Sequence, residues 1–506
     1  MEAATPRPLT GSHLFLAMLA LSLATFLIVL DYSIANVSIP YIAGDLAVSA
    51  TEGTYVITSF AVGSAIGLPI TGWLTKRVGI VRLTVWSLLG FISLSWVCGI
   101  SWNLEMLVVA RFIQGLAAGP LVPTSQSLTV MIFPPEKKNK ALAFWSTVVV
   151  VAPIVGPIVG GYISYDIRWP WIFFINIPIG LFAAFIIHSF LKPFETAKEK
   201  IATDWVGLLL LAIGVSCLQF LLDKGEQYDW FSSPIISSCA AISVICFTYL
   251  IAWQFTAKNP LLDLRLFKIP SFTVSILYIA TMYAIYFGGV ILVPLWLQEY
   301  MGYTPIWAGV AVAPIGIMPA LFSGVIAKIV SKIGAIIPLG ISVILFAISS
   351  FDGAYFTTNV DLWHIAFSRF LFGLGMLFFI VPLFHLSVRD IPTEKLPSST
   401  GMFHFVRAMM GGVGTSIFTT LWIRRSAFHH ANQVAAILPS REPVAQLYSQ
   451  MDHLRISGDK AQAVVNEMAT NQGALLGLND CFYVMGWIFI GMLAILLIGK
   501  RKKETA

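Results

Sequence analysis

Apolar stretches recur along the whole chain and are separated by short polar segments. A helix needs about 20 apolar residues to cross the hydrocarbon core of a bilayer. Fourteen stretches meet this requirement, and the first is too long to be the core of a signal peptide. We therefore expect a retained first span and thirteen more, with the bounds 14–39, 54–74, 82–100, 105–127, 140–164, 170–191, 204–222, 234–255, 271–297, 304–327, 334–351, 362–386, 398–421 and 480–499.

The positive charges of the loops are unevenly distributed between the two sides. With a cytoplasmic N-terminus, 21 of the 31 Lys and Arg residues fall on the cytoplasmic side, whereas the short outer loops hold only Arg168 and Lys224. Short loops rich in Lys and Arg stay in the cytoplasm. The pattern predicts an inner-membrane protein with both termini in the cytoplasm and an even number of spans.

Composition supports a membrane protein and argues against several other classes. The chain is 57% hydrophobic and 11% charged, whereas soluble domains carry about 25% charged residues. The net charge of +6 is small for 506 residues, so we do not expect nucleic-acid binding. The five cysteines match no metal-binding spacing, and no phosphate-binding GxxxxGK[ST] motif is present. We expect a protein that is not an enzyme, with no metal and no cofactor beyond a proton gradient.

Two blocks of six spans resemble each other. The fourth span contains Arg111 to Leu116 (RFIQGL), and the fourth span of the second block contains Arg369 to Leu374 (RFLFGL). Repeated bundles around a central site are typical of secondary transporters. We predict an all-α membrane fold with a six-helix bundle in 1–200, two inserted helices in 201–260 and a second six-helix bundle in 261–506.

The long outer loop 422–479 is the exception to the short loops. It contains apolar positions at the three- and four-residue steps of an amphipathic helix, followed by a second, shorter apolar group. One interpretation is a helix that lies on the membrane surface or on its own domain, and the other is a docking surface for a periplasmic partner. The positions are Val444, Leu447, Met451 and Leu454 in the first group and Val464, Val465 and Met468 in the second.

A few ionisable residues lie within the predicted spans. Asp31 in the first span and Arg111 in the fourth lie at similar depth, so they could approach each other. Intramembrane acids are functional by default. Burial favours the protonated acid and a neighbouring guanidinium favours the carboxylate, so Asp31 could carry a proton or a cationic substrate, or the pair could only fix helix register. Arg369 and Arg407 are further candidates.

Three histidines, His188, His385 and His404, lie near the cytoplasmic ends of spans. Imidazole titrates near neutral pH, but this position favours residues of the membrane interface over proton relays.

Glycine and proline are concentrated in the fifth span. Pro153 and Pro157 lie one helical turn apart, as do Gly156 and Gly160. Small residues at that spacing let two helix backbones approach closely, and prolines bend a helix. The stretch predicts tight packing, a hinge or seal between the halves, or both.

These motifs resemble those of the 14-helix drug:proton antiporter branch of the major facilitator superfamily, over nearly the whole chain. The matching stretches are Leu30 to Pro40 in the first span, Arg111, Gln114, Gly115 and Gly119 in the fourth, Gly156, Pro157, Gly160 and Gly161 in the fifth, and Trp171 to Gly180.

The resemblance adds Asn36 and Gln114 to Asp31 and Arg111 as candidate proton- or substrate-binding residues. It also implies conformational motifs at Gly72, Arg77, Gly79 and Arg82 after the second span and at Pro153, Gly156, Pro157, Gly160 and Gly161 in the fifth.

One departure from the family lies in the loop after the second span, where Lys76 replaces an acid that locks one conformation. A lock of that particular kind is therefore in doubt here.

The resemblance extends to the inner-membrane pumps of tripartite efflux systems and implies a periplasmic membrane-fusion adaptor and an outer-membrane channel as partners. The leading hypothesis is proton-driven export of amphipathic drugs or toxic compounds. The alternatives are a dedicated exporter of one metabolite, such as a siderophore or fatty acid, and a membrane sensor or enzyme. The last would need a soluble domain, for which 422–479 is short.

Overall fold

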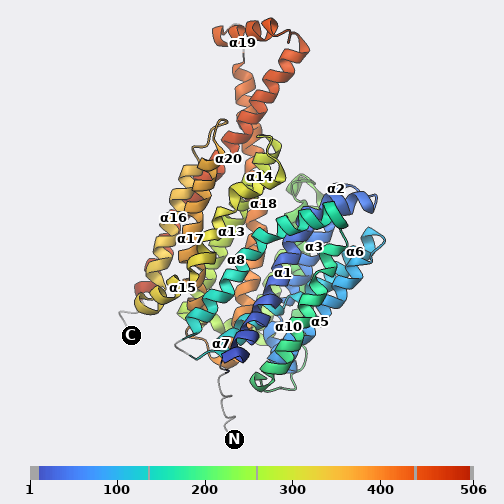
Figure 1. Cartoon of the computed structure of the whole chain (residues 1–506), viewed down its shortest axis with the longest axis vertical. Coiled ribbons are helices and arrows are strands. Elements are labelled where there is room, and N and C mark those ends of the chain that lie inside the picture. Colours follow the sequence, from blue (N-terminus) through green and yellow to red (C-terminus); the bar gives the residue numbers. More distant parts are fainter. Residues whose placement is uncertain (1–8, 10, 135–136, 258–259, 438–440, 502–506) are drawn as a thin grey trace.

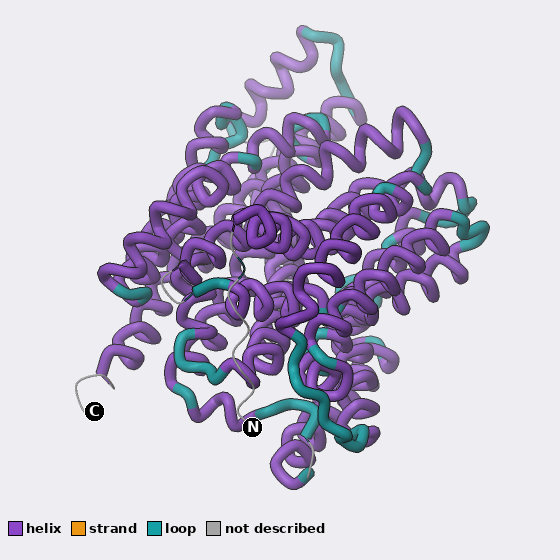
Figure 2. Tube along the Cα trace, turned by 60° about the horizontal axis from the view of Figure 1, so that its bottom comes forward, coloured by secondary structure: helices purple, strands orange, loops and turns teal. Residues whose placement is uncertain are grey.

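The computed structural model describes residues 9, 11–134, 137–257, 260–437 and 441–501. These residues form helices joined by short connections, without a strand among them (Figure 2). Each of the fourteen predicted spans coincides with a helix or with two consecutive helices. The all-α membrane fold is confirmed.

The first block, which we call the N-terminal bundle, contains ten α-helices among the described residues between 11 and 191. Their bounds are α1 Gly11–Asp45, α2 Ala50–Gly53, α3 Tyr55–Gly67, α4 Thr71–Val78, α5 Ile80–Gly99, α6 Leu104–Ala118, α7 Leu121–Ile132, α8 Lys138–Tyr162, α9 Trp171–Phe174 and α10 Asn176–Leu191.

The two inserted helices are α11 Trp205–Lys224 and α12 Pro234–Thr256. The rest, which we call the C-terminal bundle, consists of α13 Pro270–Glu299, α14 Pro305–Val312, α15 Pro314–Ile333, α16 Ile336–Gly353, α17 Leu362–Val388, α18 Leu396–Ala436, α19 Glu442–His453 and α20 Asp459–Arg501.

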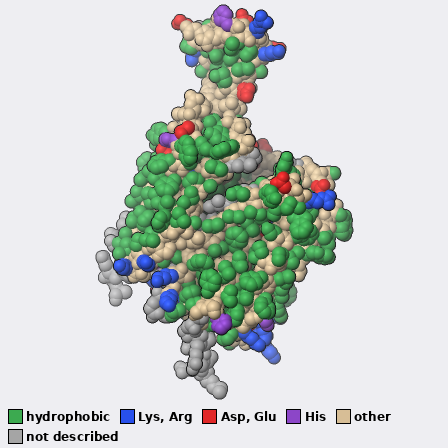
Figure 3. Space-filling view, viewed as in Figure 1, with side chains coloured by type: hydrophobic (Ala, Val, Ile, Leu, Met, Phe, Trp, Pro, Cys, Tyr) green, Lys and Arg blue, Asp and Glu red, His purple; other side chains and the backbone are tan. Residues whose placement is uncertain are grey.

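Eleven helical segments in the described residues are long and apolar enough to cross a membrane, and the bent pair α3–α4 makes a twelfth. Pro69 lies at that 59° bend, where proline removes a backbone donor and clashes with the preceding turn. The other two predicted spans coincide with α8 and the first part of α18. Large apolar side chains cover much of the outer surface (Figure 3), as expected of a multi-pass membrane protein.

The two bundles touch near the end that holds both chain termini (Figure 1). The Ser127 and Thr400 hydroxyls are 2.9 Å apart, the Thr147 and Ser323 hydroxyls 2.7 Å, and His404 Nε2 lies 2.6 Å from Gln126 Oε1. We call this set of contacts the seam. On the side of the projecting helices, the surface is hollowed between the bundles (Figure 3). The molecule is therefore closed at the terminal end.

The segment 422–479 differs from the loop that the sequence predicts. The helix α18 continues to Ala436 and α20 begins at Asp459, so the two form a helical hairpin that projects from the bundle, with α19 at its tip (Figure 1). Hydropathy could not find these extensions because they carry polar residues. These extensions are helical because they contain few helix-breaking residues outside the short turns.

The tip of the hairpin has a small apolar core of its own. Met451 on α19 and Ala461 and Val465 on α20 are buried together, whereas Leu454 and Met468 are 72% and 54% exposed. The amphipathic helix is thus present but packs on its own hairpin, far from the membrane-spanning part (Figure 1). Of the two places that this interpretation allowed, packing on its own domain is the one confirmed.

Candidate functional site

A buried ion pair joins α1 and α6 in the N-terminal bundle. Arg111 Nη1 donates to Asp31 Oδ2 at 2.5 Å, and the two side chains are 0% and 1% exposed. Opposite charges so far from water are stable only if further hydrogen bonds satisfy them. The predicted approach of Asp31 and Arg111 is confirmed.

Two more helices, α5 and α10, contribute side chains around the pair. Asn176 at the start of α10 donates to the second Asp31 oxygen at 2.8 Å. Gln114 accepts from Arg111 Nη1 at 2.7 Å and donates to Ser95 on α5, also at 2.7 Å. Each polar group thus fixes the rotamer of its neighbour, and a buried network of this kind specifies one packing arrangement.

The guanidinium is also held by the backbone and by aromatic rings. Arg111 Nε donates to the carbonyl of Val56 on α3 at 3.1 Å. Its central carbon lies 4.2 Å from the centroid of the Phe60 ring and 5.3 Å from that of Phe173. These cation–π contacts suit the planar guanidinium better than an ammonium.

Two buried polar atoms of this network have no described hydrogen-bond partner. They are Arg111 Nη2 and Asn176 Oδ1. A buried donor or acceptor without a partner costs about 1–3 kcal/mol, so the arrangement has hydrogen-bonding capacity left over. A water molecule or a shift of the Asp31 carboxyl group would use it.

The glycines of the fifth span bring α8 against α1 beside Asp31. A Cβ added at Gly156 would lie 2.5 Å from the side chain of Ser33, and one added at Gly160 would lie 3.0 Å from that of Ile34. Close packing at these two glycines is confirmed. Their neighbour is α1 of the same bundle and not the other bundle, while Gly161 has nothing within 4 Å of such a Cβ.

The N-terminal part of the same helix α8 contacts the C-terminal bundle through Trp145. The Trp145 indole donates to Thr25 and Ser125, each at 3.1 Å, inside the N-terminal bundle. Its ring also contacts Phe384 and His404 of the C-terminal bundle, with centroids 5.3 and 5.9 Å apart. Helix α8 therefore connects the surroundings of Asp31 to the seam.

His404 is completely buried in the seam. The expectation of an interfacial histidine is wrong for this residue, because α18 begins eight residues earlier and carries it into the contact between the bundles. Sequence reasoning could not find its partner Gln126, which is 278 residues away.

The loop after α4 receives an acid from a distant segment. Glu195 accepts from the backbone amides of Val81 and Arg82 at 3.0 and 3.1 Å, at the N-terminus of α5, and lies 3.9 Å from the Arg82 side chain. The positive end of a helix dipole stabilises a carboxylate. An acid thus stands near this loop although Lys76 occupies the family's usual acidic position.

The other residues of this motif have different surroundings. Gly72 packs against Ser398 of the C-terminal bundle, where a Cβ would overlap the serine side chain. Gly79 has a φ of +96°, which side-chain-bearing residues rarely adopt. Arg77 donates to Thr203 at 2.7 Å.

The remaining candidates lie apart from the ion pair. The side chain of Asn36 is exposed and outside the network, whereas Arg407 donates to the Tyr283 hydroxyl at 3.4 Å. Arg369 is buried in the C-terminal bundle. Pro153 and Pro157 belong to α8, but their side chains lie outside the described residues.

Sequence reasoning assigned no role to Asn176, Ser95, Trp145 or Glu195. Asn176 carried a signal as part of the motif from Trp171 to Gly180, and Trp145 as the start of the stretch that leads into the motif of the fifth span. A polar amide within an apolar span usually has a partner in the protein interior.

Known proteins resemble the chain over nearly its full length. It is 42% identical to the multidrug export protein EmrB of Escherichia coli (strain K12), covering 98% of this chain and 97% of that protein. It is 40% identical to the fatty acid resistance protein FarB of Neisseria gonorrhoeae, covering 97% of each. Among solved structures, the human organic anion transporter MFSD10 has a TM-score of 0.61 at 13% identity, covering 96% of this chain and 100% of that one.

A sequence model of the Major Facilitator Superfamily matches residues 21–415. This range includes the ion pair, the glycine contacts of α8 and the seam. Together with the relatives at 42% and 40% identity, it shows that this chain belongs to the Major Facilitator Superfamily.

Proposed function

We propose that this protein is a proton-driven exporter of hydrophobic or amphipathic toxic compounds, and that Asp31 is its proton-carrying residue. The observation that carries the proposal is the buried Asp31–Arg111 pair. Relatives named as multidrug export proteins come from Escherichia coli and Haemophilus influenzae, at 42% and 43% identity. These names favour drug export over a dedicated metabolite exporter. The relative named for fatty acid resistance is similar to this chain to nearly the same degree, at 40% identity.

Protonation of Asp31 changes the network in a defined way. The carboxylate accepts hydrogen bonds on both oxygens, from Arg111 and Asn176. A protonated carboxyl group is a donor at one oxygen and a weaker acceptor there, so one of these two accepted hydrogen bonds is weakened. The unpartnered Asn176 Oδ1 and Arg111 Nη2 are the atoms that a rearranged network would use.

Helix α8 couples this rearrangement of the ion pair to the seam between the two bundles. Gly156 and Gly160 of α8 pack against Ser33 and Ile34 of α1, within one helical turn of Asp31. A shift of α1 at Asp31 therefore displaces α8. On the same helix, Thr147 belongs to the seam and the Trp145 ring contacts His404 of the seam. Packed interfaces switch between discrete arrangements. Protonation of Asp31 therefore favours either the closed or the open arrangement of the seam.

The energy source follows from the same site. One charge that crosses a potential of 100 mV releases about 2.3 kcal/mol. One proton carried by Asp31 per cycle can therefore support a useful drug gradient. We place the protein in the inner membrane with both termini in the cytoplasm, so that the hollow between the bundles faces the periplasm.

We further propose that the helical hairpin binds a periplasmic membrane-fusion adaptor, which continues to an outer-membrane channel. The hairpin projects away from the membrane-spanning helices (Figure 1). A cavity on it, lined by Ile437, Val444, Leu447, Val465 and Met468 among others, offers apolar surface to a partner.

The test is drug resistance in a strain that lacks its own exporters. Cells with the wild-type protein are expected to grow at drug concentrations that stop cells with Asp31→Asn, at equal amounts of membrane-inserted protein. A control is Asp45→Asn, which changes an acid outside the ion pair that accepts from Trp169. Equal resistance of the Asp31→Asn and wild-type strains would refute the proposed role of Asp31.

A further inference from the structure

The last turn of the inserted helix α11 is attached to the N-terminal bundle by two charged side chains. Thr58 Oγ1 on α3 donates to Asp223 Oδ2 at 2.5 Å, and Gln219 Nε2, one turn earlier in α11, donates to Asp223 Oδ1 at 3.0 Å. Lys224 Nζ lies 4.4 Å from the centroid of the Tyr55 ring at the start of α3. A hydrogen bond to a carboxylate is roughly twice as strong as one between neutral groups. These side chains therefore fix the position of the turn on α3.

The same turn touches the C-terminal bundle through smaller groups. The Ser416 hydroxyl on α18 donates to the backbone carbonyl of Leu222 at 2.9 Å. One turn before Ser416, a Cβ added at Gly412 would lie 3.6 Å from Gln219 Oε1 and 3.9 Å from Leu222 Cδ1, which is ordinary van der Waals contact. A glycine has no side chain that blocks the movement of a neighbouring helix, and a hydroxyl group can exchange one backbone carbonyl for another. This contact therefore resists sliding less than the contact with α3.

Both contacts lie at the end of the bundles opposite the seam. Helix α3 begins directly after α2, at the end of the N-terminal bundle that lies away from the chain termini (Figure 1). Alternating access rocks one bundle against the other, so opening the seam changes the spacing of the bundles at the opposite end. The last turn of α11 touches both bundles there, so it cannot keep both contacts unchanged.

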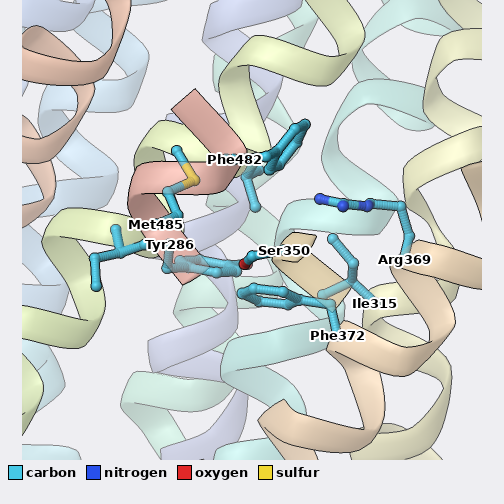
Figure 4. A pocket seen from close by; sticks show the side chains of 10 residues that line it. Tyr286, Ile315, Ser350, Arg369, Phe372, Phe482 and Met485 are labelled. Carbon is cyan, nitrogen blue, oxygen red and sulfur yellow. The ribbon is translucent and has the colours of Figure 1, made fainter. Parts of the chain in front are cut away.

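The interiors of the two bundles are too closely packed to absorb this change. In the C-terminal bundle, the space between Arg369 on one side and Tyr286 and Met485 on the other is about 10 Å³ (Figure 4), which is close to the smallest volume that holds one water molecule. In the N-terminal bundle, a Cβ added at Gly63 would overlap the backbone of Phe112. Closely packed interiors transmit a displacement and do not yield to it. The change must therefore occur at contacts between the bundles.

We propose that Asp223 is a positioning residue that holds α11 on the N-terminal bundle, and that α11 slides over Gly412 and Ser416 of α18 when the bundles rock. The inserted helix then moves with the N-terminal bundle throughout the cycle. The stronger contact persists and the weaker one yields, as in the shear movements of packed helices. This inference rests on the transport cycle proposed above and specifies which contact of α11 changes in it.

The test measures distances between pairs of spin labels in the purified full chain in lipid nanodiscs, by pulsed electron paramagnetic resonance. The five native cysteines are replaced by alanine, and labels are attached at exposed positions just after α11, in the N-terminal bundle and in the C-terminal bundle. The labelled variants are Gln227→Cys, Trp102→Cys and Ala427→Cys, combined in pairs. Each pair is measured in acidic and in alkaline buffer and with Asp31→Asn, which mimics the protonated acid.

Variants at Asp223 show whether this residue holds the helix. Asp223→Ala removes the acceptor of the Thr58 hydrogen bond and should broaden the distribution of distances between the labels at 227 and 102. Asp223→Asn keeps an oxygen that accepts from Thr58 and should leave the distribution narrow. Glu105→Ala, which changes an exposed acid in the first turn of α6, is the matched control. An unchanged distribution in Asp223→Ala would overturn the role of Asp223.

The three distances decide whether α11 slides. We expect the distance between the labels at 102 and 427, which reports the rocking, to change by about 5 Å between conditions. The distance from 227 to 427 should change with it, and the distance from 227 to 102 should stay constant. A change in the distance from 227 to 102 would overturn the inference, because α11 would then leave the N-terminal bundle. Three constant distances would overturn it together with the proposed cycle. Because no drug is present, a failure here is distinct from a failure of drug export.

Discussion

Gly156 of α8 lies directly against Ser33 of α1, two residues beyond Asp31, with no room for even a methyl group between the helices. The contact places Gly156 and Gly160 of the fifth span next to the buried ion pair and not between the two bundles. Any movement of Asp31 that displaces α1 must therefore displace α8, which carries Trp145 to the seam.

A methyl group at this contact should uncouple the site from the seam. In Gly156→Ala the added Cβ lies 2.5 Å from the Ser33 side chain, so α1 and α8 must separate. We expect drug export to fall below about a tenth of the wild-type rate, because small shifts of positioning elements cost large factors in function. Gly161→Ala has open space around its Cβ and should export normally. Equal export by both variants would contradict the coupling through α8.

The ion pair should show strong non-additivity in stability. Asp31→Asn leaves the Arg111 charge buried without its carboxylate, and breaking a buried pair costs about 3–5 kcal/mol. Adding Arg111→Gln removes that charge, so the double variant should unfold at a higher temperature than Asp31→Asn alone. Thermal unfolding in nanodiscs measures this. A double variant less stable than Asp31→Asn would show that the pair is not the main energetic term.

A disulfide across the seam should stop transport reversibly. The Thr147 and Ser323 hydroxyls are 2.7 Å apart, so the two side chains are in contact and can be replaced by cysteines that face each other. The double variant Thr147→Cys/Ser323→Cys is expected to lose export on mild oxidation and to regain it with a reductant. Each single cysteine variant is the control for the five native cysteines. Full export by the oxidised double variant would mean that the seam does not open.

Glu195 should stabilise the protein through the N-terminus of α5. Its carboxylate accepts from two backbone amides there, and the loss of a cap of this kind costs about 0.5–2 kcal/mol. We expect Glu195→Ala to lower Tm. A matched control is Glu199→Ala, because the described contact of Glu199 with Lys76 is made by its backbone. Equal Tm values for the two variants would remove the capping role.

The helices and the ion pair could be predicted because both depend on patterns along the chain. Twenty apolar residues identify a span wherever it packs, and the depth of Asp31 and Arg111 follows from their distance to the span ends. The spacing of Gly156 and Gly160 showed that one face of α8 packs closely, but not which helix it meets. That choice depends on the tertiary arrangement of the spans.

The missing parts have a common cause. Asn176, Gln126 and Glu195 meet partners that lie 114 to 278 residues away along the chain, and no local pattern marks such pairs. The hairpin was missed because its helices leave the membrane, where hydropathy ceases to indicate helix. His404 was misplaced because its distance from the span end gives depth but not the direction in which its side chain points.

The most direct test of the proposed proton site uses everted membrane vesicles that contain the protein. A proton gradient is imposed, a lipophilic fluorescent drug is added, and drug uptake and the collapse of the gradient are followed together. We predict a drug-dependent proton leak that accompanies uptake in the wild type and is lost in Asp31→Asn but kept in Asp45→Asn. Drug uptake by Asp31→Asn with an undiminished proton leak would contradict the assignment of Asp31 as the proton carrier.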